Sequence, residues 1–277
     1  MSRKKGDLII IGGNEQKSPD AENSILKEVA SAASSQKGRL VVLTVASEIP
    51  EEVAETYRAT FGKLGVKHVE VLDIRTREQA YDAKNVEKLS DASVLFFTGG
   101  DQLRITSQMG GSPVLERIFA LHEEGVTIVG TSAGAAASSE TMLIGGSGNE
   151  SRIVGLAMAP GLGLMKGAIV DSHFAQRGRF GRLLGAVAQN PHNLGIGIDE
   201  DTALYLRNDK IFSVLGAGAV YVFDGTAVSY TNLSERVAEG VITVHDVRVH
   251  VLAKDSRFDL QARRPLPPSG KKREDVT

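Results

Sequence analysis

The sequence predicts an α/β fold with a mostly parallel central sheet, and three observations lead to this expectation. Short, β-rich and almost continuously apolar segments alternate with helix-like segments through the first half of the chain. Parallel strands that are covered on both faces show this pattern. Glycines gather directly after several of these segments, and ligands bind at the carboxyl ends of strands in open α/β sheets. The second half is richer in strands, which indicates hairpins that extend the sheet or pack beside it.

Five strands are expected in the first half of the chain, with helices in the connections between them. The strands cover residues 8–11, 40–44, 68–72, 94–97 and 126–129. Helix-like patterns cover residues 21–34, 51–64 and 114–124. This order predicts parallel strands joined by right-handed crossovers, with helices wrapped around the sheet.

The second half adds strand patterns and ends in a polar tail. The expected strands cover residues 167–171, 195–198, 202–206, 210–215, 219–224 and 241–252. No linker or internal repeat separates the two halves, so we expect a single domain over residues 1–262. Residues 263–277 are proline-rich and charged, which is typical of a flexible tail.

Composition narrows the class of partner. The chain has 277 residues, 42% of them hydrophobic, which is enough for a full core without disulfides. The net charge of −2 argues against binding nucleic acid or an anionic membrane over the whole surface. No stretch approaches the ~20 apolar residues of a membrane span. Together with the absence of cysteine, this predicts a cytoplasmic protein that acts on small polar or charged molecules.

The most informative motif is the stretch VTIVGTSAGAAA at residues 126–137, where an apolar strand enters an alanine-rich segment through Gly-x-Ser-x-Gly. This pattern is typical of a nucleophile elbow, because a serine in a strained turn needs small neighbours. Ser132 is therefore the candidate nucleophile. The elbow also places the backbone N–H of Ala133 where an oxyanion forms during acyl transfer. The alternative is a tight turn in which the serine only caps a helix.

Glycines also follow two other predicted strands, at Gly12 and Gly13 and at Gly99 and Gly100. If the strands are parallel, these loops leave the sheet at the same edge as Ser132 and line one crevice. The alternative is that each glycine only makes a turn. No dinucleotide fingerprint and no phosphate-binding loop is present in the sequence, so we expect no nucleotide cofactor. Acyl transfer to a serine needs no metal, and we expect none.

A serine nucleophile needs a base, and His173 is the best candidate among six histidines. It follows the apolar stretch GAIVDSHF, at a strand end, with Asp171 on the same side of that strand. The other histidines lie in ordinary structural settings; they are His68, His122, His192, His245 and His250. The alternative for His173 is a buried structural histidine.

Charged residues surround the proposed base. Arg177, Arg179 and Arg182 follow His173 closely, and guanidinium groups bind carboxylates in bidentate fashion, which indicates a substrate that carries carboxylates. A solvated helix face is the alternative. Asp199, Glu200 and Asp201 follow a later strand, and one of them can orient the base. Alternation places Glu200 opposite its neighbours, and the pattern alone leaves both faces open.

Four motifs in this order resemble cyanophycinases, in the serine peptidase family that also includes peptidase E. The motifs are TGGDQ at 98–102, GTSAGA at 130–135, DSHFAQRGRFGRL at 171–183 and GIDEDTAL at 197–204. The resemblance runs from IIGGNE at 10–15 through the hairpins after residue 210. It implies a three-layer αβα sandwich of the class I glutamine-amidotransferase type, a homodimer, and hydrolysis of cyanophycin, a poly-aspartate with arginine on each β-carboxylate, to β-Asp-Arg dipeptides.

Carried onto this sequence, the resemblance implies Ser132 as nucleophile, His173 as base and Glu200 as orienting acid. Gly99 or Gly100 then completes an oxyanion hole with Ala133. The implied substrate-binding residues are Asp101, Gln102, Asp171, Ser172, Arg177, Arg179 and Arg182. Within this set, arginines hold backbone carboxylates, while Asp101, Gln102 and Asp171 receive guanidinium or amino groups. Ser172 departs from the glutamine expected there.

Three alternatives stay open at this stage. Ser172 leaves room for an aspartyl or isoaspartyl dipeptidase of the same family. An α/β-hydrolase esterase also uses Gly-x-Ser-x-Gly, although its acid precedes its histidine in the chain. A non-catalytic binding domain with the same shell is the third alternative.

Overall fold

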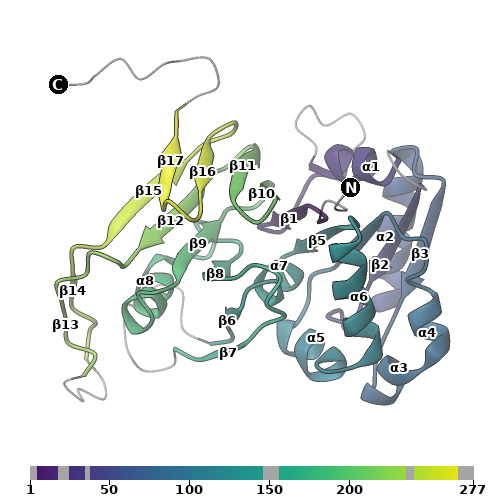
Figure 1. Ribbon diagram of the computed structural model, residues 1–277, viewed down its shortest axis with the longest axis horizontal. Coiled ribbons are helices and arrows are strands. Elements are labelled where there is room, and N and C mark those ends of the chain that lie inside the picture. The colour runs from purple at the N-terminus through teal and green to yellow at the C-terminus, as the bar shows by residue number, and fades with distance from the viewer. Residues whose placement is uncertain (1–4, 18–24, 35–37, 146–155, 235–239, 268–277) are drawn as a thin grey trace.

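A computed structural model describes residues 5–17, 25–34, 38–145, 156–234 and 240–267 (Figure 1). In this part of the chain the main sheet has nine strands, in the order β17-β16-β11-β10-β1-β5-β4-β2-β3. A four-stranded sheet, in the order β15-β12-β9-β8, lies at the end of the molecule away from β2 and β3 (Figure 1). The functional candidates lie where these two sheets approach each other.

The parallel part of the main sheet matches the strands expected in the first half to within two residues. Its strands are β1 (Leu8–Ile11), β2 (Arg39–Leu43), β3 (His68–Leu72), β4 (Val94–Phe97) and β5 (Thr127–Thr131). β1 pairs with β5 in parallel register, Ile9 with Val129 and Ile11 with Thr131. This register brings the carboxyl ends of both strands to one edge of the sheet.

Helices cover both faces of these strands. They are α1 (Ile25–Ser34), α2 (Pro50–Lys63), α3 (Arg77–Tyr81), α4 (Ala83–Glu87), α5 (Gln102–Met109) and α6 (Pro113–Glu123). On one face Ile9 of β1 packs in a cluster with Phe61 of α2, and on the other Ile10 shares a cluster with Ile118 of α6. Successive residues of a strand point to opposite faces, so β1 contributes to both cores. The expected helices are confirmed, except that residues 21–24 lie outside the described residues.

The expectation of a mostly parallel sheet is wrong, because the main sheet is mixed. β10 (Thr202–Arg207) runs antiparallel to β1, and β11 (Ile211–Gly216) continues antiparallel from β10. For β11 the physical reason is the tight connection to β10 at 208–210, where Asn208 and Asp209 have positive φ angles. A short hairpin joins antiparallel strands only, whereas parallel strands need a long crossover.

The remaining strands of the second half form the four-stranded sheet and small ribbons. β8 (Ala168–Asp171) pairs in parallel with β9 (Leu194–Ile198), and α8 (Phe180–Gln189) connects the two strands. β12 (Val220–Asp224) pairs antiparallel with β9, and β15 (Arg248–Leu252) pairs antiparallel with β12 and forms an edge of the sheet. Small two-stranded ribbons pair β6 (Thr141–Leu143) with β7 (Met158–Pro160) and β13 (Tyr230–Thr231) with β14 (Val244–His245). The strand expected at 241–252 is thus two strands, separated at Asp246 with its φ of 64°.

Part of the expected C-terminal tail is ordered structure. β16 (Arg257–Asp259) pairs with β17 (Arg264–Leu266), and β17 lies within the range 263–277 that was expected to be flexible. Pro265 is tolerated because β17 is the edge strand of its sheet. The Arg263 guanidinium also bonds the Asp224 carboxylate at 2.9 Å. Residues 268–277 lie outside the described residues.

The helices that the structure describes are all too short or too polar to cross a lipid bilayer.

Candidate active site

Ser132 lies on a sharp turn between β5 and α7 (Ala133–Ala137), as the Gly-x-Ser-x-Gly pattern predicts. Its backbone has φ 53° and ψ −107°, a strained conformation for a residue with a side chain. A Cβ atom at Gly130 would lie 2.4 Å from the Gly134 carbonyl oxygen, and one at Gly134 would lie 2.5 Å from the Phe97 carbonyl oxygen. Both glycines are therefore required for the close approach of strand and helix.

Ser132, His173 and Glu200 meet in one chain of contacts. The Ser132 Oγ lies 2.9 Å from His173 Nε2, and His173 Nδ1 lies 2.7 Å from Glu200 Oε1. Ser132 follows β5, His173 follows β8, and Glu200 follows β9, so each comes from the carboxyl end of a different strand. His173 has a φ of 47°, and its side chain is about 10% exposed. The hydroxyl, the imidazole and the carboxylate are thus joined by two hydrogen-bond contacts, an arrangement that is compatible with the roles expected of them.

The surroundings of His173 favour its neutral form. Burial lowers the pKa of His173, the hydrogen bond to Glu200 raises it, and the charges of Arg177 and Arg179 lower it. Hydrogen bonds from His173 and from Asn14 lower the pKa of Glu200, so its carboxylate stays ionised. An ionised carboxylate only accepts, so Nδ1 of His173 carries the proton. Nε2 is then free to accept the proton of the Ser132 hydroxyl.

Only one of the three consecutive acids reaches the histidine. Asp199 turns away and accepts from the backbone N–H groups of Ala175 and Ala219, at 3.0 and 3.1 Å. Asp201 accepts from the backbone and the side chain of Gln16, at 3.0 and 2.8 Å. The alternation expected for this segment is therefore present, and the side that faces the histidine is that of Glu200.

Of the two glycine loops expected to line one crevice with Ser132, the loop of Gly99 and Gly100 lies beside Ser132, whereas Gly12 and Gly13 are absent from the lining of its cavity. A Cβ atom at Gly99 would lie 3.3 Å from the Ser132 Cβ. Gly100 has a φ of 138°, and a Cβ there would lie 2.0 Å from the Ala46 carbonyl oxygen. Gly100, Ser132 and Ala133 line one cavity of about 170 Å³. Of the residues expected to form an oxyanion hole, Gly100 and Ala133 therefore border the cavity of Ser132, and Gly99 is absent from its lining.

A family model described as "Peptidase family S51" matches residues 8–214, which include all three residues of the contact chain. This chain belongs to peptidase family S51. A cyanophycinase of Geminocystis herdmanii (strain PCC 6308) is 38% identical over 264 residues, which cover 95% of this S51 peptidase and 96% of the relative. A cyanophycinase of Nostoc sp. (strain PCC 7120 / SAG 25.82 / UTEX 2576) is 40% identical over 265 residues, which cover 95% and 88%.

A solved structure shows the same fold. The crystal structure of a peptidase from an acI-B1 Actinobacterium superposes with a TM-score of 0.67 at 21% identity, covering 90% of this S51 peptidase and 99% of that chain. The resemblance to the serine peptidase family is thus confirmed, and membership of that family excludes the α/β-hydrolase alternative.

Arg177, Arg179 and Arg182 line the cavity and form the arginine wall of the S51 site, which contains a buried carboxylate. Asp171, 2% exposed, accepts from Arg179 Nη1 at 3.1 Å, from Arg182 Nε at 2.6 Å and from Arg182 Nη2. Asp171 was expected to receive a guanidinium group of the substrate, but both of its oxygens are already bonded to arginines of the protein. Asp171 ends β8, and Arg179 and Arg182 lie at the start of α8, so its carboxylate is already paired within the protein.

Arg177 differs from the other two arginines. It lines the cavity and is exposed, and among the residues that the structure describes no carboxylate forms an ion pair with it. Among the described residues, its guanidinium is therefore the one of the three that no carboxylate of the protein engages. Arg179 and Arg182 are half-buried and paired, so the alternative of a solvated helix face does not apply to them.

The remaining expected substrate contacts fall into two groups. Gln102 and Ser172 line the cavity, and Gln102 Nε2 donates to the Leu143 carbonyl at 2.8 Å. Asp101 is absent from the cavity lining and caps α5 by accepting from the Leu103 N–H at 2.8 Å. The Asp101 carboxylate thus caps the N-terminus of α5 and does not face the cavity.

Two further side chains that follow β1 reach the site, and neither was among the residues expected there. Asn14 Nδ2 donates to Glu200 Oε2 at 2.8 Å. Glu15, 3% exposed, accepts from the hydroxyl groups of Tyr57 and of Thr131, the residue before Ser132. The signal was present, because both residues directly follow a strand that pairs with β5 and so reach the same edge of the sheet.

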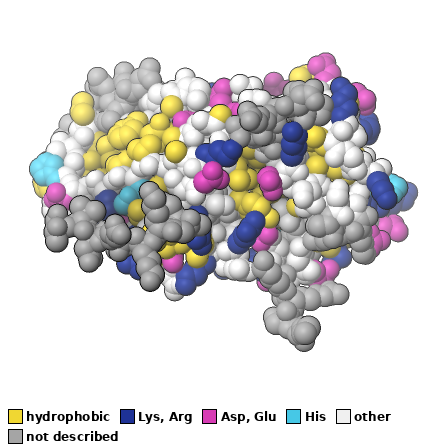
Figure 2. Space-filling view, turned by 90° about the horizontal axis from the view of Figure 1, so that it is seen from above, with side chains coloured by type: hydrophobic (Ala, Val, Ile, Leu, Met, Phe, Trp, Pro, Cys, Tyr) yellow, Lys and Arg dark blue, Asp and Glu magenta, His cyan; other side chains and the backbone are white. Residues whose placement is uncertain are grey.

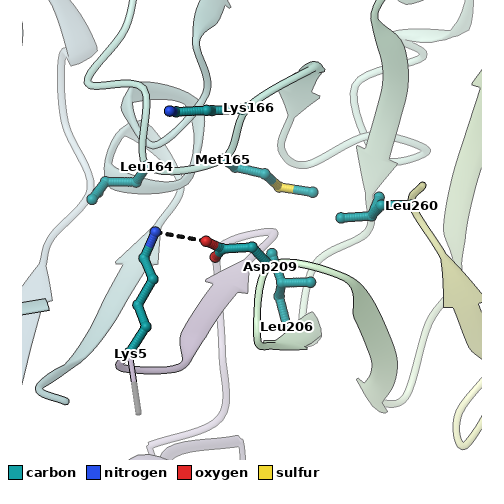
Figure 3. A pocket seen from close by; sticks show the side chains of 7 residues that line it. All are labelled: Lys5, Leu164, Met165, Lys166, Leu206, Asp209 and Leu260. Atoms are coloured by element: carbon teal, nitrogen blue, oxygen red, sulfur yellow. Dashed lines mark hydrogen bonds and ion pairs between the residues drawn. The ribbon is translucent and has the colours of Figure 1, made fainter. Parts of the chain in front are cut away.

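A second cavity of about 110 Å³ lies at the opposite edge, where strands begin (Figure 3). Lys5 lies before β1 and Lys166 before β8, and Lys5 Nζ bonds Asp209 at 2.6 Å (Figure 3). This second cavity shares no lining residue with the cavity of Ser132.

Proposed function

We propose that this S51 peptidase is a serine-type exopeptidase that degrades cyanophycin, multi-L-arginyl-poly-L-aspartate, to β-Asp-Arg dipeptides. The observation that carries the proposal is the contact chain from the Ser132 hydroxyl through the His173 ring to the Glu200 carboxylate. The names of the similar curated proteins support the choice of substrate. A polymer that offers both carboxylates and guanidinium groups also suits a cavity lined by arginines and amide groups.

In the mechanism that we propose, His173 Nε2 accepts the Ser132 hydroxyl proton as Ser132 Oγ attacks the scissile carbonyl. Backbone N–H groups of Gly99 or Gly100 and of Ala133 stabilise the negative oxygen of the tetrahedral intermediate. His173 then gives its proton to the leaving amine, and the acyl-enzyme forms on Ser132. Water, deprotonated by His173, hydrolyses this ester and regenerates the serine. None of these steps uses a metal or cofactor.

For substrate binding, we propose that Arg177 takes the carboxylate of the residue that is cleaved off. Arg179 and Arg182 add positive charge from behind, while their bonds to Asp171 hold them in place. Gln102 and Ser172 border the same space and offer hydrogen bonds to the arginyl group. Because serine has a short side chain, an aspartyl or isoaspartyl dipeptide is the second candidate substrate.

The decisive test of this function incubates the pure protein with insoluble cyanophycin and identifies the soluble products by mass. We expect β-Asp-Arg, and we expect Ser132→Ala to lower turnover by several orders of magnitude, on the order of 10⁵-fold or more. The matched control is Ser107→Ala, which removes an exposed hydroxyl on α5. Release of free aspartate from dipeptides, without cleavage of the polymer, would move the assignment to the second candidate.

A serine-directed acylating reagent separates catalysis from a binding-only shell. We expect a sulfonyl fluoride to modify Ser132, because His173 increases the nucleophilicity of its oxygen. Mass spectrometry of a digest locates the modified residue. An unmodified Ser132 would favour a non-catalytic binding domain.

We further propose a cytoplasmic homodimer built on one domain of residues 1–262, with three αβα layers of the glutamine-amidotransferase type. Helices on both faces of the parallel strands support the layering.

For the dimer, hydrophobic side chains gather at the end of the molecule that holds the four-stranded sheet (Figure 2). There Val249 and Val251 of the edge strand β15 are 39% and 63% exposed. Sedimentation equilibrium tests this: a Val251→Lys variant should shift a dimer toward monomer.

A further inference from the structure

Residues 11–16, which comprise the last residue of β1 and the loop after it, contact the neighbourhood of each proposed catalytic residue. The Gly12 carbonyl accepts from the His173 backbone N–H at 2.7 Å, and the Gly13 carbonyl accepts from the Asp201 N–H at 2.9 Å. The Ser132 N–H donates to the Ile11 carbonyl at 3.1 Å. One short segment thus ties together the three loops that carry the serine, the histidine and the glutamate.

Gly13 supports the histidine ring directly. It has a φ of 98°, and a Cβ atom at this position would lie 2.4 Å from both Cε1 and Nε2 of His173. The imidazole therefore rests against bare backbone, with no space for a side chain between them. This contact restricts the ring on one side but leaves its rotation to be set by the Glu200 carboxylate.

The Glu200 carboxylate is in turn held by one side chain outside the three. Its Oε1 lies 2.7 Å from His173 Nδ1, and its Oε2 accepts from Asn14 Nδ2 at 2.8 Å. The Glu200 side chain is 27% exposed, so water competes for Oε2 when Asn14 does not occupy it. With both oxygens engaged, the carboxylate plane is defined by one donor on each side.

We propose that Asn14 is a positioning residue that holds Glu200 in the orientation in which it aligns His173 with Ser132. This inference rests on the proposed function of the three residues. Asn14 touches neither the serine nor the cavity, so it acts through Glu200 alone. Its loss leaves the substrate contacts of Arg177 unchanged and removes part of the alignment of the base, so turnover falls while substrate binding does not.

A backbone role is the competing explanation for Asn14. It has a φ of 48°, and asparagine is one of the few residues other than glycine that adopt this conformation readily. Asn14→Gly separates the two roles, since glycine keeps the left-handed backbone and loses only the amide. Asn208→Gly is the matched control, because this exposed asparagine has a φ of 54° in the hairpin between β10 and β11.

The experiment measures kcat and KM on cyanophycin, together with the rate at which a sulfonyl fluoride acylates Ser132. Losing a hydrogen bond to a charged group predicts a fall of roughly 10- to 100-fold in kcat and in acylation rate for Asn14→Gly. KM should stay within about twofold, since Asn14 makes no substrate contact. Asn208→Gly should match the wild type in all three quantities. Far-ultraviolet circular dichroism shows that each variant is folded.

A double-mutant cycle with Glu200→Ala decides whether Asn14 acts through the carboxylate. In that background we expect Asn14→Gly to change the acylation rate by less than about twofold. Two outcomes overturn the proposal. In the first, the effects of Asn14→Gly and Glu200→Ala on the acylation rate multiply in full in the double variant. In the second, Asn14→Gly alone keeps wild-type rates. If wild-type protein is acylated at Ser132 but leaves cyanophycin intact, the substrate assignment fails while the acylation rates still test Asn14. A wild-type Ser132 that resists acylation overturns the positioning role as well.

Discussion

Asp171→Asn tests whether the arginine wall depends on its buried carboxylate. The Asp171 side chain is 2% exposed, and its partners Arg179 and Arg182 are 15% and 11% exposed. The substitution preserves the shape of the side chain, removes its charge and turns one acceptor into a donor. The two guanidinium groups that share this carboxylate then lose their counter-charge.

The magnitude follows from the burial of these three groups. Removing one partner of a buried ion pair costs about 3–5 kcal/mol, and we take about 3 kcal/mol because the cavity admits water to both arginines. Unfolding entropy of about 2.1 cal/mol/K per residue gives about 0.6 kcal/mol/K for a chain of 277 residues. The expected decrease in Tm is therefore about 5 °C.

Thermal unfolding followed by circular dichroism provides the measurement, with Glu55→Gln as control. Glu55 pairs with Arg58 at 3.0 Å, but the two side chains are 71% and 50% exposed, so the control should lose less than about 1 °C. Adding Arg182→Met to Asp171→Asn should recover part of the lost stability, because it removes one unpaired buried charge. Equal Tm values for Asp171→Asn and the control would falsify this account of the wall.

Three further predictions concern single contacts. Burial, and in part the charge of Arg177, hold the pKa of His173 below its usual 6.5. Because the base must be neutral, Arg177→Gln should raise this pKa and move the acid limb of Ser132 acylation to higher pH. An acid limb at the same or a lower pH contradicts this. Tyr57→Phe removes a hydrogen bond to the buried Glu15 carboxylate and should destabilise the fold by about 2 kcal/mol in urea titrations. Gly13→Ala, which would push the His173 ring away, should lower kcat by about 10²-fold or more, and a smaller loss means that the ring tolerates the methyl group.

Local patterns were sufficient for the elements that carry the candidate site. β1 and β4 begin and end where the apolar runs do, because a strand buried on both faces needs every residue to be apolar. The sharp turn at Ser132 could be predicted from the sequence because its geometry requires small residues on either side, here Gly130 and Gly134. The positions of His173 and Glu200 after strands placed them at the correct edge of the sheet. These are properties of short segments, which a linear pattern records.

Long-range partners required the folded chain. The direction of β10 depends on its pairing with β1, about 190 residues away in sequence. Nothing near Asp171 shows that its oxygens bond to Arg179 and Arg182 and not to a ligand. Likewise Asn14 meets Glu200 only because β1 lies between β5 and β10 in the sheet. Periodicity reports which side of a segment is buried, while hydrogen bonds and ion pairs between distant segments depend on how strands are ordered in space.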